Sequence, residues 1–148
     1  MKKLLSLTIL LVLGTMAFSQ KANQELEYYQ AVFGITKEAM ITDYIKLDKS
    51  AEFWTVYNEY EKERQIYGQK RYELLLKFAG NSVNYSDKRM DILMAETLAN
   101  RKTMAKITNK YYKKIKKVSG SKAASKFLMI ESYFESNIRA SILGGLKD

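Results

Sequence analysis

The chain of 148 residues contains no cysteine, no histidine and no proline. Without cysteine it has no disulfide framework, no thiol nucleophile and no thiolate ligand for zinc or iron–sulfur clusters. Without histidine it has no imidazole base and no imidazole-bound transition metal, which leaves carboxylates for hard cations such as Ca²⁺ or Mg²⁺. The absence of proline removes the strongest helix breaker and permits long uninterrupted helices.

The length fits one domain rather than several. Apolar residues make up 47% of the chain and charged residues 28%, and the formal net charge is +9. This composition is typical of a globular chain and not of a disordered one.

Residues 1–19 have the order of a secretory signal peptide. Lys2 and Lys3 form a basic start, and residues 4–13 form an apolar run. Ala17-Phe18-Ser19 has the small-x-small order of a cleavage site, with cleavage expected after Ser19. The run is shorter than the roughly 20 residues of a transmembrane helix, although an uncleaved N-terminal anchor is the alternative. We expect a signal peptide at 1–19 and a single all-helical domain at 20–148, with no stable membrane insertion after cleavage. Export argues against nucleic acid as a partner and against ATP-dependent chemistry.

The rest of the sequence predicts an all-α fold with four helices and no strand. The expected ranges are 24–45, 51–79, 86–117 and 122–142. Ser50 and Ser86 are predicted as N-caps, Gly80-Asn81 as a left-handed stop, and Ser119-Gly120-Ser121 as a break that also caps the next helix. The second helix would be about 44 Å long. A helix of that length predicts an elongated molecule with a central antiparallel hairpin, a dimer, or both.

The second predicted helix carries a seam at alternating steps of four and three residues, with two arginines in its middle. The seam positions are Phe53, Tyr57, Tyr60, Arg64, Tyr67, Arg71, Leu74 and Phe78. A second seam on the third helix would face it, and the fourth helix has an apolar face that includes Phe127, Ile130/Glu131, Phe134, Ile138 and Ile142.

Carboxylates are the only candidate catalysts. Glu59, Glu61 and Glu63 cluster on the second helix, and Glu59 and Glu63 share one face. Such a pair could perform acid–base chemistry or bind a hard cation, but solvated charge on an exposed helix is the more common arrangement. The sequence has no phosphate-binding loop, nucleophile elbow or dinucleotide fingerprint. We therefore expect no catalytic residue, no metal site and no cofactor.

The main electrostatic feature is a stretch from Thr97 to Ile130 that contains no acidic residue and is rich in lysine and arginine. Helical spacing predicts a basic stripe with aromatic inserts, which would attract acidic or partly unfolded polypeptides or an anionic membrane surface. Solvated helix with favourable dipole interactions is the alternative. The candidate polypeptide-binding residues are Arg101, Lys106, Lys110, Tyr111, Lys113, Lys114 and Lys117.

Two junctions carry a family resemblance. Leu47-Asp48-Lys49-Ser50 leads into the Phe53-Trp54-Thr55-Val56-Tyr57-Asn58-Glu59-Tyr60 stretch, and Val118-Ser119-Gly120-Ser121-Lys122 leads into the Ala123-Ala124-Ser125-Lys126-Phe127-Leu128 stretch. The region from Thr42 to Ile142 resembles the Spy/CpxP group of periplasmic proteins with LTxxQ motifs. It is most similar to the Bacteroidetes versions described as sensors of extracytoplasmic-function sigma factors.

Both motifs are degenerate in this sequence. Leu47, Asp48 and Ala51 stand at the Leu, Thr and Gln positions of the first motif, and Val118, Ser119 and Lys122 at those of the second. Asp48 and Ser119 keep oxygen atoms that could cap a helix. The metal-responsive relatives use histidine-bearing sites, and this chain has no histidine.

The resemblance implies an elongated, cradle-shaped homodimer in the periplasm that takes part in the envelope stress response. One implied function is an ATP-independent chaperone (holdase) that binds unfolding or acidic polypeptide clients. The alternative is a regulator that binds one envelope signalling protein, such as a member of an anti-sigma or sensor-kinase pathway. An enzyme that uses carboxylates is the hypothesis from a third class.

Overall fold

The computed structural model describes residues 25, 27–29, 35–46 and 51–144 of the chain. Residues 25 and 27–29 are helical, and they are followed by α2 (Lys37–Ile45), α3 (Ala51–Asn81), the short 3-10 helix η1 (Ser82–Asn84) and α4 (Asp87–Leu143). No strand occurs among these residues, which confirms the predicted all-α class. The predicted signal peptide and the Ser50 N-cap lie outside the described residues.

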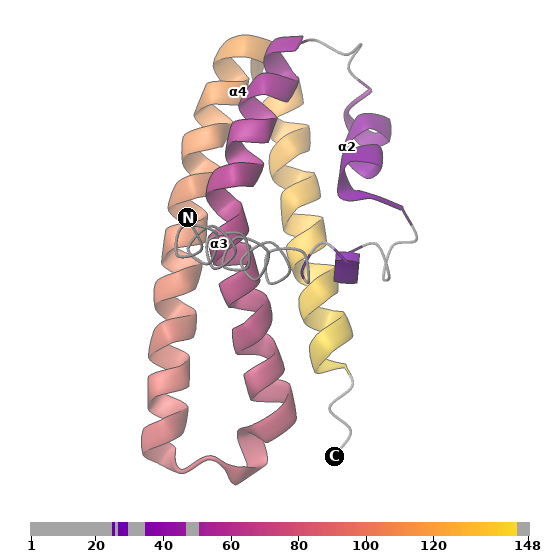
Figure 1. Ribbon diagram of the computed structural model, residues 1–148. Coiled ribbons are helices and arrows are strands. Elements are labelled where there is room, and N and C mark those ends of the chain that lie inside the picture. Colours follow the sequence, from indigo (N-terminus) through magenta and orange to yellow (C-terminus); the bar gives the residue numbers. More distant parts are fainter. Residues whose placement is uncertain (1–24, 26, 30–34, 47–50, 145–148) are drawn as a thin grey trace, which may run out of the picture.

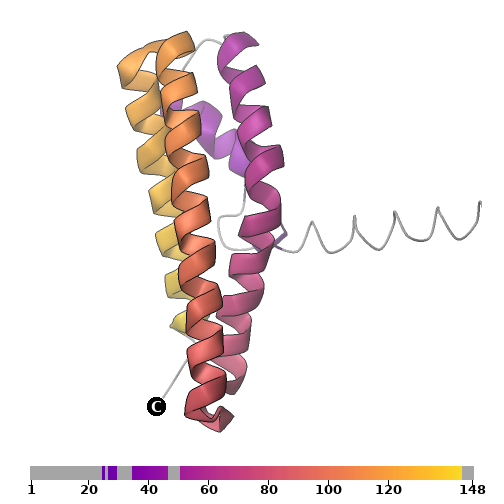
Figure 2. The ribbon, with the colours of Figure 1, turned by 90° about the vertical axis from the view of Figure 1, so that its left-hand side faces the viewer.

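The two long helices lie side by side. α3 runs into η1, after which the first part of α4 (87–119) returns along it in the opposite direction (Figure 1). At Gly120 the chain turns again, and the second part of α4 (121–143) runs back beside both. Figure 2 shows the same elongated arrangement from the side. The hairpin end at η1 extends beyond Leu143, where α4 stops, so the second part of α4 covers only part of the long pair.

Gly120 makes the reversal possible. Its φ of 81° and ψ of 169° lie in a region that residues with a Cβ atom rarely adopt. The predicted break at Ser119-Gly120-Ser121 is confirmed at this residue. The Oγ of Ser119 is buried and makes no hydrogen bond with the described residues, so its hydroxyl does not provide the expected cap.

Two predicted helix boundaries are wrong in detail. The first helix is not continuous from 24 to 45, because Thr36 is extended (φ −68°, ψ 151°) and its Oγ1 accepts a hydrogen bond from the Ala39 N–H at 3.2 Å. This side-chain cap starts a new helix, α2, at Lys37. α3 has no left-handed stop at Gly80-Asn81, since it continues through Asn81 directly into η1. Ser86 is the N-cap residue of α4 as predicted, but its side chain makes no capping hydrogen bond.

The core forms where α3 meets both parts of α4. The predicted seam of α3 is largely confirmed, because Phe53, Tyr57, Tyr60, Arg64, Arg71 and Leu74 are buried, while Tyr67 is 36% exposed. On α4 the buried positions include Ile107, Ile115, Phe127, Phe134 and Ile138. Aromatic rings meet edge to face at the centre, with the Tyr60 and Phe127 ring centroids 4.9 Å apart. α2 lies against α4 and contributes Ile41 and Ile45 to the same core.

Candidate functional site

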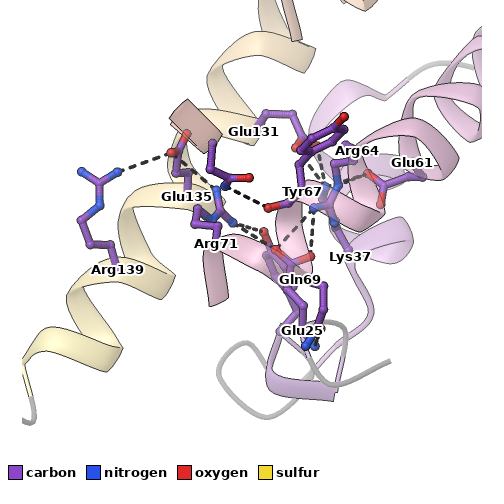
Figure 3. A network of polar contacts seen from close by, with 12 residues as sticks. Glu25, Lys37, Glu61, Arg64, Tyr67, Gln69, Arg71, Glu131, Glu135 and Arg139 are labelled. Carbon is purple, nitrogen blue, oxygen red and sulfur yellow. Dashed lines mark hydrogen bonds and ion pairs between the residues drawn. The ribbon is translucent and has the colours of Figure 1, made fainter. Parts of the chain in front are cut away.

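A network of charged side chains is buried between the helices (Figure 3). Its centre is Arg64 of α3, which is only 1% exposed. The Arg64 Nε lies 2.9 Å from the Glu61 carboxylate, and its Nη1 lies 3.1 Å from Glu25. Arg71, two turns further along α3, places its Nη2 3.1 Å from the other oxygen of Glu25. The two arginines of the seam therefore hold one buried carboxylate between them.

Lys37 of α2 is the second centre of this network. Its Nζ lies 2.7 Å from Glu61 of α3 and 2.9 Å from Glu131 of α4, so one ammonium group joins three helices. Tyr60 donates a hydrogen bond to Glu131 at 2.7 Å, and Tyr57 donates one to Glu61 at 2.9 Å. The Nζ also lies 5.4–6.0 Å from the centroids of four aromatic rings, a distance at which cation–π attraction contributes.

The network balances its charges. The carboxylates of Glu25, Glu61 and Glu131 face the cations of Lys37, Arg64 and Arg71. Because an unpaired buried charge costs several kcal/mol, this balance is what permits so many charged groups in the interior. Glu135 extends the network towards the surface, 3.5 Å from Arg71 and 3.4 Å from Arg139.

The pKa values follow from this arrangement. Burial alone would lower the pKa of the Lys37 ammonium, but the Glu131 and Glu61 carboxylates outweigh it and raise that pKa above its ordinary value. Burial alone would raise the pKa of Glu61, but Lys37 and Arg64 lower it to about 2. Burial raises the pKa of Tyr57 and of Tyr60 well above the ordinary value, so both phenols stay protonated and donate.

Only part of this network leaves a signal in the amino-acid sequence. The two arginines within an otherwise apolar seam and Glu131 on the apolar face of the fourth helix were the available signals. Glu25 and Lys37 gave no such signal, since both belong to a segment that was predicted as one continuous helix. Glu61 was interpreted as solvated charge together with Glu59 and Glu63, which is wrong for Glu61 because it points into the network.

Glu59 and Glu63 instead pair with the basic stripe. The Lys114 Nζ lies 2.8 Å from Glu59, and the Lys110 Nζ lies 2.6 Å from Glu63. Tyr111 does not form an exposed aromatic insert, because it is 3% exposed and donates a hydrogen bond to Glu63 at 2.8 Å. Burial and this bond raise the pKa of Tyr111 to about 12.

The other candidate binding residues lie on the surface of α4. Arg101, Lys106, Lys113 and Lys117 are exposed and form no ion pair with any residue that the structure describes. The predicted stripe is thus divided: Lys110 and Lys114 are neutralised by α3, while the remaining cations face solvent.

A groove runs between the two parts of α4, and we call it the α4 groove. It has a volume of about 700 Å³. Arg101 and Lys102 line it together with the apolar side chains of Leu98, Met104, Tyr112 and Leu128. Glu135 also lines the groove, but its carboxylate pairs with Arg71 and Arg139. Leu98 is 63% exposed. The groove therefore combines positive charge with apolar surface that is open to solvent.

The degenerate motif positions are only partly placed. Leu47 and Asp48 lie outside the described residues, as does the side chain of Ala51. Val118 and Ser119 are half-buried beside the Gly120 turn, and Lys122 is exposed. The second junction therefore contributes to the reversal of the chain.

Comparisons with family models, with curated proteins and with solved structures find no match to this chain. The Spy/CpxP resemblance accordingly stays a prediction. Within the part of the chain that the structure describes, no cluster of three or more acidic side chains is placed to hold a metal ion. None of the described helices is long and apolar enough to cross a membrane.

Gly68 of α3 has no Cβ atom, and the side chains of Glu25 and Arg64 occupy the space that a Cβ atom would need. A Cβ atom at Gly68 would overlap the Glu25 carboxylate and lie 2.5 Å from the Arg64 Nη1. Gly68→Ala should lower the free energy of unfolding by about 1–3 kcal/mol, because buried ion pairs must move. Gly80→Ala is the matched control, since nothing lies within 4 Å of its Cβ position. That variant should gain about 0.5–1 kcal/mol from helix propensity. Urea unfolding measures the free energy of unfolding of both variants. A higher value than the native protein's in both variants would contradict the crowding at Gly68.

The lowered pKa of Glu61 predicts an acid-dependent stability. A carboxyl group whose pKa falls from 4.5 in the unfolded chain to about 2 in the folded protein stabilises the fold above the unfolded value. This contribution is lost as the pH falls through the folded value. Glu61→Gln should therefore be less stable than the native protein at neutral pH and should lose less stability between about pH 5 and pH 2. Glu59→Gln, which affects an exposed pair, should follow the native profile. Parallel pH profiles for all three proteins would refute this role of Glu61.

Proposed function

We propose that this protein is an exported, ATP-independent polypeptide-binding protein of the holdase type, similar in role to the Spy/CpxP group. It binds unfolding or acidic polypeptides without making or breaking a covalent bond. We place its activity in the periplasm, where the predicted signal peptide would deliver it.

The α4 groove is the observation that carries the proposal. Cations at Arg101 and Lys102 lie beside the exposed side chain of Leu98 and the half-buried side chains of Tyr112 and Leu128. Unfolding chains expose apolar side chains, and burying them against such a surface stabilises the complex by about 25 cal/mol per Å² of apolar area. The cations add attraction for acidic segments and raise the rate of encounter. This combination favours many weak contacts with different chains rather than one chemical reaction.

A second apolar surface supports a homodimer. Ile35, Tyr44, Met129 and Tyr133 are each about half exposed (46–55%) and together line a hollow of about 330 Å³ between α2 and the second part of α4. We propose that a second copy covers this hollow and that the pair forms the cradle which the resemblance implies. Sedimentation of the exported protein should then give the mass of two chains, whereas a monomer at all concentrations would contradict it.

Aggregation of a chemically unfolded client provides the test of function. The protein should suppress aggregation at near-stoichiometric amounts without nucleotide. Suppression should weaken as salt rises, because exposed charges are screened beyond about 8 Å at physiological ionic strength. The double variant Arg101→Glu/Lys102→Glu should lose most of the activity.

The double variant Lys88→Glu/Lys116→Glu is the matched control, since it changes the net charge equally at exposed positions of the same helix outside the α4 groove. It should retain most of the activity. Equal loss in both variants would mean that only overall charge matters. No suppression by the native protein, with a single partner recovered by affinity capture, would favour the signalling regulator instead.

A further inference from the structure

A smaller pocket shares Arg101 with the α4 groove and is lined by Leu143, the last residue of α4. It has a volume of about 220 Å³ and lies between α3 and both parts of α4. Its apolar lining comes from Leu74, Leu75, Phe78, Met94 and Leu143. Because α3 and the first part of α4 extend past the end of α4, no third helix among the described residues lies over this end of the long pair (Figures 1 and 2). We call this hollow the arginine pocket.

Three arginines and no carboxylate line the arginine pocket: Arg71, Arg101 and Arg139. Arg71 and Arg139 both form ion pairs with Glu135, which does not line the pocket, and Arg71 also pairs with Glu25. Arg101 is exposed and forms no ion pair with the described residues. The Nε of Arg71 is buried and has no hydrogen-bond partner among them either. The lining therefore carries one cation, Arg101, that has no ion-pair partner among the described residues, beside an apolar floor.

The size of the pocket selects the kind of ligand. Pockets for drug-sized molecules have volumes of about 300–1,000 Å³, and this one is smaller. It suits one large apolar side chain, which is how anchor residues of polypeptides fill pockets at interfaces. Arg101 lines both this pocket and the α4 groove, so a chain bound along the groove would pass its opening.

We propose that the arginine pocket binds one large apolar side chain of a partner polypeptide, and that a carboxylate next to that side chain pairs with Arg101. This inference rests on the proposed function and defines its partner more closely. The preferred segments then combine an aromatic or leucine side chain with neighbouring aspartate or glutamate. Apolar segments flanked by lysine would be bound poorly, because they bring like charge to Arg101.

Fluorescence anisotropy with labelled disordered peptides tests this preference. The first peptide has a central phenylalanine between aspartate and glutamate. In the second peptide lysine replaces both acids, and in the third alanine replaces phenylalanine. The native protein should bind the first peptide about tenfold or more tightly than either of the others. Equal affinity for the three peptides would overturn the proposal.

Two variants address the two parts of the pocket. Arg101→Glu removes the charge partner at an exposed position, and Thr97→Met fills the hollow. Among the described residues, the Thr97 hydroxyl donates only to the Leu93 carbonyl of its own helix, so this substitution breaks no hydrogen bond between described helices. Each variant should weaken binding of the first peptide by about tenfold. Lys116→Glu, an exposed change outside both hollows, should alter it by less than about threefold.

The outcomes separate this inference from the function on which it rests. If the native protein suppresses client aggregation but both pocket variants bind the first peptide normally, the arginine pocket is not the anchor and the holdase proposal stands. If the native protein neither binds the peptide nor suppresses aggregation, both proposals fail. Circular dichroism melting of each variant establishes that it is folded. Because Arg101 is exposed, Arg101→Glu should fold even if Thr97→Met does not, so the peptide-binding test can still be made.

Discussion

Arg64 is a buried cation, only 1% exposed, and the packing of the helices depends on the carboxylates that pair with it. Glu25 and Glu61 pair with it directly, and Lys37 connects Glu61 to Glu131 on the second part of α4. Removing one partner of such a network leaves a buried charge unpaired, at a cost of about 3–5 kcal/mol. Apolar contacts tolerate small shifts, whereas these short ion pairs require one arrangement of α2, α3 and α4.

The outer surface of α4 follows from this constraint. Glu131 draws the second part of α4 against α2 and α3, and Gly120 allows the chain to reverse so that the two parts lie side by side. The α4 groove forms between them, with Arg101, Lys102 and Leu98 facing solvent. Glu59 and Glu63 neutralise lysines on the α3 side, so the unpaired cations remain on the outer surface. Interior charge thus sets the geometry, and exterior charge supplies the attraction for other chains.

Sequence periodicity was sufficient for the all-helical class, most of the α3 seam and the break at Gly120, because these depend on residues close together along the chain. The new helix that begins after Thr36 was not predicted. Apolar residues recur at helical spacing on both sides of Thr36, so the sequence gives little indication that this threonine is an N-cap. Tyr111 and Lys110 were assigned to an open surface because their partner, Glu63, is far away in the sequence and only tertiary structure brings it near. The α4 groove needed both parts of α4 in place and could not be derived from a single helix.

Site-specific photo-crosslinking to an unfolded client tests the central claim most directly. A photoreactive residue at Leu98, which is 63% exposed in the α4 groove, is matched by one at Ile66, which is 73% exposed on α3 and does not line the groove. The account predicts strong crosslinking of the client from position 98 and little from position 66. Equal crosslinking from both positions, or none from position 98 while client aggregation is suppressed, would contradict it.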